Sequence, residues 1–144
     1  MRKRSRYGRE NESELLASRL VVRELESVSD CLYFSAVCQE EYPELSELFD
    51  SFGRAHADNM KCLEKVLSGL GAKYLQNIRA NAKGLSECKA DDMVEYLVSA
   101  ENENILLYEK LYLIDKTGAF DVPLKEILRA SKERLSILEN ILKT

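Results

Sequence analysis

Several residue types that mark particular protein classes are scarce in this chain. It has no Trp, two Pro and six Gly among 144 residues. Because Pro and Gly interrupt helices, their scarcity favours long helices. No apolar run approaches the ~18 residues that a transmembrane helix needs, so we expect no membrane span. The charged residues 1–14 are not followed by an apolar stretch, which argues against a secretory signal.

Cysteines are few and show no paired spacing. The four, Cys31, Cys38, Cys62 and Cys88, include no CxxC motif. We therefore expect reduced thiols in a cytoplasmic protein, and the spacing assigns none of them a role. With 45% hydrophobic and 32% charged residues, the chain is typical of one soluble globular domain.

The net charge of −4 is unevenly distributed. Residues 1–9 contain five of the 21 basic residues and no acidic one, which leaves 16 basic against 25 acidic residues in the remainder. An acidic body argues against nucleic acid as a partner. We predict that residues 1–11 form a mobile basic N-terminus and that residues 12–144 form the folded domain.

Helical periodicity predicts an all-α protein of four helices. They are expected at about 12–40, 43–69 and 91–116, and from an N-cap at Asp121 to the C-terminus. Short connections predict that the first and second helices, and the third and fourth, form antiparallel hairpins. Residues 71–90, which could include a short helix at 72–83, are numerous enough to cross the length of a four-helix bundle.

The two halves of the chain are similar at an offset of 75 residues, as expected for two related hairpins. The matching pairs are Glu26 and Glu101, Tyr33 and Tyr108, Phe52 and Ile127, Leu63 and Leu138, and Leu67 and Leu142.

Each predicted helix carries a polar residue at the centre of its apolar stripe, and two helices carry a second one three positions later. These residues are Glu26, His56, Asn59, Glu101, Ser131 and Arg134. The distance along the chain is 30 residues from Glu26 to His56 and also from Glu101 to Ser131. Because acidic side chains are rarely buried without a partner, we interpret this set as a site. Carboxylates and Glu-x-x-His motifs on four helices are known to form dimetal centres.

Over residues 12–144 the sequence resembles the ferritin-like superfamily, and within it the small rubrerythrin-like proteins. The resemblance rests on E-x6-Y twice, at Glu26 and Tyr33 and at Glu101 and Tyr108. It also rests on the stretches LFDSFGRAHADNMKCL and ILRASKERLSIL. The resemblance implies a ferritin-like bundle, a diiron site and a homodimer.

The chain departs from that family at the expected metal ligands. Where the family has Glu-x-x-His on the second and fourth helices, this chain has His56-x-x-Asn59 and Ser131-x-x-Arg134. A dimetal centre needs several anionic oxygen ligands. The sequence therefore indicates a degenerate diiron site.

Two interpretations of this degenerate site remain. In the favoured one there is no cofactor, and Arg134, with His56, compensates the buried charges of Glu26 and Glu101. The chain is then a non-catalytic structural or interaction protein with an unidentified protein partner. In the alternative, Glu26, His56 and Glu101 hold one Fe, Mn or Zn ion of an oxidoreductase. Whether the chain is an enzyme stays open, and the lost ligands argue against it.

Two further features leave alternatives open. Tyr33 and Tyr108 either pack in the core or, beside a metal, relay electrons. Cys31 and Cys38 share a face with Leu20 and Phe34, which we place away from the Glu26 stripe. That face is expected to bind a second copy of the chain or residues 71–90.

Overall fold

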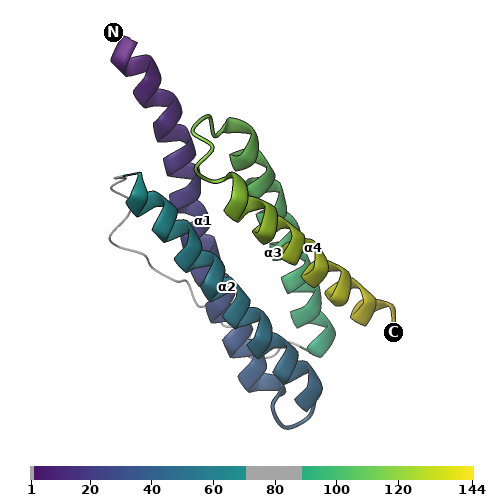
Figure 1. The fold of residues 1–144 in the computed structure, drawn as a ribbon. Helices are drawn as coiled ribbons and strands as arrows, with labels where there is room; N and C mark the ends of the chain where they lie inside the picture. The colour runs from purple at the N-terminus through teal and green to yellow at the C-terminus, as the bar shows by residue number, and fades with distance from the viewer. Residues whose placement is uncertain (1, 71–88) are drawn as a thin grey trace.

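The protein is described by a computed structural model that covers residues 2–70 and 89–144, with side chains from residue 12 onward. Within these ranges it contains helices and no strands (Figure 1). The helices are α1 (Arg2–Cys38), α2 (Pro43–Gly69), α3 (Ala90–Ile114) and α4 (Asp121–Lys143). The expected all-α architecture of four helices is confirmed.

The bounds agree with the sequence pattern except at the N-terminus. Helix α1 begins at Arg2, so most of the basic segment 1–11 continues the helix instead of preceding it. Helix α2 has Pro43 in its first turn, where the missing N–H costs nothing. The helix considered for residues 72–83 lies outside the described residues.

The turn between α3 and α4 is organised by Asp115 and not by the expected cap. Helix α4 begins at Asp121, and the residue before it forms no side-chain cap. Asp115 instead accepts hydrogen bonds from the backbone N–H of Thr117 (3.0 Å), the Thr117 hydroxyl (2.7 Å) and the backbone N–H of Phe120 (3.3 Å). Gly118 has a φ of 74°, a conformation that glycine adopts without strain. The prediction of Asp121 as the N-cap is therefore wrong.

The four helices pack side by side as one bundle (Figure 1). Helix α1 contacts α2 and α3, and α4 contacts α3 and α2. The α1–α2 turn lies at one end of the bundle and the α3–α4 turn at the other (Figure 1). Within the described ranges, no helix is long and apolar enough to cross a membrane.

The apolar core is divided into two clusters. The first cluster consists of Leu16, Ala17, Leu20, Val21, Leu63, Leu67, Tyr108, Leu111, Phe120, Leu124 and Ile127. The second cluster consists of Cys31, Phe34, Cys38, Phe49, Phe52, Met93, Val94, Leu97 and Leu138. On every helix the two sets of positions are separated by a gap in the sequence, and buried polar residues fall in these gaps.

Helix α1 presents the opposite face to the core from the one expected. Leu20, Cys31, Phe34 and Cys38 are at most 2% exposed, whereas Tyr33 is 40% exposed. The assignment of the Cys31 face to a dimer contact or to residues 71–90 is therefore wrong. An alignment error of two residues turns a helix by about 200°, which exchanges its inner and outer faces.

Candidate functional site

A layer of charged side chains lies between the two apolar clusters. It consists of Glu24 from α1, His56 from α2, Glu101 from α3 and Arg134 from α4, and we call these four residues the polar layer. Each is at most 5% exposed. Four ionisable groups so deeply buried are stable only if they satisfy one another.

The polar layer is a continuous chain of contacts across the bundle. His56 Nδ1 lies 2.9 Å from Oε2 of Glu24, and its Nε2 lies 3.3 Å from Oε2 of Glu101. The other oxygen of Glu101, Oε1, accepts from Arg134 Nη2 at 3.0 Å and Nε at 3.2 Å. Arg134 Nη2 also donates to the hydroxyl of Ser131 at 3.0 Å. His56 therefore bridges two carboxylates, and Glu101 bridges a histidine and an arginine.

The surroundings of His56 favour its protonated form. Burial alone would lower the pKa of His56, but hydrogen bonds and attraction from Glu101 and Glu24 outweigh it and raise the pKa to about 9. Only a doubly protonated imidazole can donate to both carboxylates at once. With His56 charged, two carboxylates face two cations, and the formal charge of the layer is zero.

The pKa of Glu101 moves in the opposite direction. Burial would raise the pKa of this carboxyl, but His56 and then Arg134 hold it below its ordinary value. Glu101 is thus the ionised acceptor that links both cations. Its position between them makes it the residue on which the charge balance most depends.

Tyr108 lies beside the layer with its side chain fully buried. Burial and the nearby carboxylate of Glu24 raise the pKa of Tyr108 well above its ordinary value, so it stays neutral. Among the described residues, neither the Tyr108 hydroxyl nor Oε1 of Glu24 has a hydrogen-bond partner. The layer thus has unsatisfied hydrogen-bonding capacity on its Glu24 side.

Five of the six residues expected at the site are buried in the structure. It places His56, Glu101, Ser131 and Arg134 in direct contact with one another. Asn59 is 8% exposed, and its Nδ2 has no hydrogen-bond partner among the described residues. These positions lie where the stripes of α2, α3 and α4 indicated.

The sixth expected residue, Glu26, is not part of the layer. Its side chain is only half-buried and lies near Tyr96, whose pKa it helps to raise. Glu24, two positions earlier, takes the place predicted for Glu26. Tyr33, the expected partner of Glu26, lies on the exposed face of α1. Both assignments were wrong for the same reason, the two-residue error on α1.

Sequence reasoning also missed the polar contacts that connect α1 to α3 beside the layer. Arg23 donates from Nε to Oδ1 of Asn104 at 2.6 Å and pairs with Glu103 at 2.8 Å. Asn104, buried at 1% exposure, donates to the hydroxyl of Ser27 at 3.5 Å. The spacing of Ser27 and Asn104, 77 residues, equals that of Glu24 and Glu101 and is the signal that could have found them.

The side chains of the layer do not fit the dimetal centre that the resemblance implies. Both ring nitrogens of His56 face carboxylates, and the Arg134 guanidinium lies 3.0 Å from Glu101. A cation placed among them would displace His56 and be repelled by Arg134. In the described part of the chain, no three His, Cys, Asp or Glu side chains are arranged to hold a metal ion. The set Glu26, His56 and Glu101 is not assembled, because Glu26 lies outside the layer.

No protein-family model and no curated protein sequence matches this chain. Its function is therefore argued from the polar layer and the fold.

Proposed function

We propose that this chain is a ferritin-like, rubrerythrin-like bundle in which Arg134 and His56 supply the positive charge that metal ions supply in that family. On this proposal the protein has no cofactor and acts as a structural or interaction protein, not as an enzyme. The observation that carries it is the bridging position of His56 between Glu24 and Glu101.

Charge balance supports the proposal. Two buried carboxylates repel each other strongly in a medium of low dielectric constant, and they require two positive charges nearby. Arg134 has a fixed charge, and His56 acquires one from its two acceptors. A network satisfied in this way adds little net stability, but it fixes the register of the four helices. That role requires no substrate.

The arrangement of the helices also supports a ferritin-like topology. The two short turns lie at opposite ends of the bundle, as expected for two antiparallel hairpins joined by a long crossover (Figure 1). The crossover itself, residues 71–88, lies outside the described residues. A homodimer, if it forms, must use a face other than that of Cys31, because that face is in the core. Leu32, Tyr33 and Val37, each at least 40% exposed, are the apolar residues that α1 offers instead.

The proposal is tested by restoring the lost ligands. A quadruple variant with His56→Glu, Asn59→His, Ser131→Glu and Arg134→His recreates Glu-x-x-His on both α2 and α4. After anaerobic incubation with Fe(II), we expect the variant to retain iron on desalting and the wild type not to. Elemental mass spectrometry measures iron per chain, and circular dichroism verifies that the variant is helical.

Two matched additions show whether the iron occupies the layer. Adding Glu24→Gln to the quadruple variant should reduce iron retention, because Glu24 would be a ligand. Adding Glu26→Gln should leave retention unchanged, because Glu26 lies outside the layer. A folded quadruple variant that retains no iron would overturn the ferritin-like assignment.

A further inference from the structure

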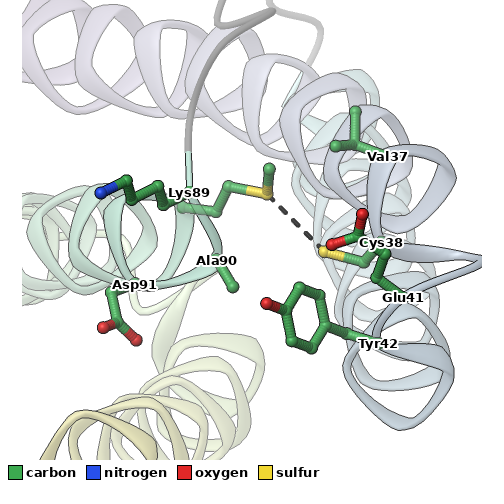
Figure 2. A pocket seen from close by; sticks show the side chains of 8 residues that line it. Val37, Cys38, Glu41, Tyr42, Lys89, Ala90 and Asp91 are labelled. Atoms are coloured by element: carbon green, nitrogen blue, oxygen red, sulfur yellow. Dashed lines mark hydrogen bonds between the residues drawn. The ribbon is translucent and has the colours of Figure 1, made fainter.

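A cavity of about 640 Å³ lies at the end of the bundle where α1 ends and α3 begins. Figure 2 shows the side chains that line it, including Cys38 and Glu41 from the end of α1 and the turn after it. Met93 and Asp91 line it from α3, and Tyr42 closes one side. The polar layer is not part of this cavity.

The wall of the cavity contains two sulfur atoms in contact. Sγ of Cys38 lies 3.7 Å from Sδ of Met93, as the dashed line in Figure 2 shows. The donors come from different helices, and both side chains are 2% exposed. A thiol and a thioether are soft donors, and the remaining side chains of the wall offer only hard oxygen or nitrogen atoms.

We propose that Cys38 and Met93 bind one Cu(I) ion at this wall of the cavity. Soft sulfur donors select Cu(I) over the hard divalent ions, which prefer oxygen ligands. A monovalent d¹⁰ ion also accepts the small number of donors present here. This site is independent of the proposed function, because it uses no residue of the polar layer.

The sulfur separation fits a bridging ion. At a metal–sulfur bond length of about 2.3 Å, two sulfurs on one ion lie at most about 4.6 Å apart. The observed 3.7 Å corresponds to an angle of about 107° at the ion. The ion would form two bonds with little movement of either helix, and the bent angle leaves its open side toward the cavity.

Charge in and around the site favours a monovalent cation. Binding replaces the thiol proton of Cys38 by Cu(I), and the proton goes to solvent with no change of oxidation state. The product, a thiolate with one positive ion, is neutral and suits a buried position, whereas a divalent ion would leave a net buried charge. Glu41 and Asp91 against Lys89 give the rest of the lining a formal charge of −1, which attracts cations.

The test is an anaerobic titration of the reduced full chain with Cu(I) in competition with bicinchoninate, which reports free Cu(I) by its colour. We expect the wild type to withdraw one Cu(I) per chain. Cys38→Ser and Met93→Leu should each abolish this binding, and Met93→Leu keeps the side-chain volume so that the fold is preserved. Circular dichroism of each variant verifies folding.

Control variants exclude the other thiols and a general effect of methionine. Cys62→Ser, Cys88→Ser and Met60→Leu should each leave the binding unchanged. Copper absorption spectroscopy of the loaded wild type should show two sulfur neighbours, and one in Met93→Leu at high protein concentration. If a folded Met93→Leu variant binds as the wild type does, or if Cys62→Ser or Cys88→Ser loses the ion, the proposed site is refuted.

Discussion

The charge on His56 makes a prediction about stability and pH. The folded chain raises the pKa of His56 from 6.5 to about 9, so the folded state binds more protons than the unfolded state between these values. Stability therefore falls as pH rises through this interval. The rise in pKa corresponds to about 3 kcal/mol of unfolding free energy, present below pH 6.5 and lost above pH 9.

Other groups titrate near the upper end of this interval and must be separated from His56. Burial raises the pKa of Cys31 and Cys38, so the unfolded thiols lose their protons first. Stability then falls above about pH 8.5 for this reason too. The His56→Gln variant supplies the control, because its amide has no titration here and the thiols are unchanged.

The assay is urea unfolding followed by circular dichroism at pH values from 6 to 9.5. The difference in unfolding free energy between wild type and His56→Gln should shrink as pH rises, by at most about 1.4 kcal/mol per pH unit. Because the chain has one histidine, NMR titration of its single imidazole gives the folded pKa directly. Parallel stability curves, or an imidazole that titrates at or below pH 6.5, would refute the bridging role of His56.

Three further variants test separate parts of the structure by denaturant unfolding. Arg134→Met should cost about 3–5 kcal/mol because it leaves Glu101 buried without its arginine. Adding Glu101→Gln should cost less than the sum of the two single changes, and strict additivity would argue against the pair. Glu24→Gln should cost about 1–3 kcal/mol, whereas Glu26→Gln should stay within about 0.5 kcal/mol; the reverse order would contradict the orientation of α1. Asp115→Ala should cost about 1–3 kcal/mol through its three lost hydrogen bonds, and an unchanged midpoint would contradict their contribution.

The faces of α2 and α4 were readable from the sequence because both helices have one strong apolar stripe. Around His56 and Ser131 the large apolar residues recur every three or four positions, and the opposite faces are charged. The polar residues at the centre of such stripes must be buried. Their mutual contact followed from the expected four-helix packing, and so did the compensating role suggested for Arg134.

Helix α1 could not be oriented in the same way, because both of its faces carry apolar residues. Its core face includes Ser13 and Ser27, which weaken the stripe, while Leu15 and Tyr33 lie on the exposed face. The repeat at an offset of 75 then selected Glu26, although α1 and α3 correspond at 77. Only the packed structure, in which Glu24 contacts His56, resolves the ambiguity.

The central claim is that protein charges occupy the place of metal in this bundle, and metal content tests it most directly. The full chain is purified without a metal-affinity column or chelator. Fe, Mn and Zn per chain are then measured by elemental mass spectrometry, before and after anaerobic incubation with Fe(II). The account predicts well below one ion per chain in both states. About one tightly held ion per chain, lost in His56→Ala and retained in Cys38→Ser, would contradict it.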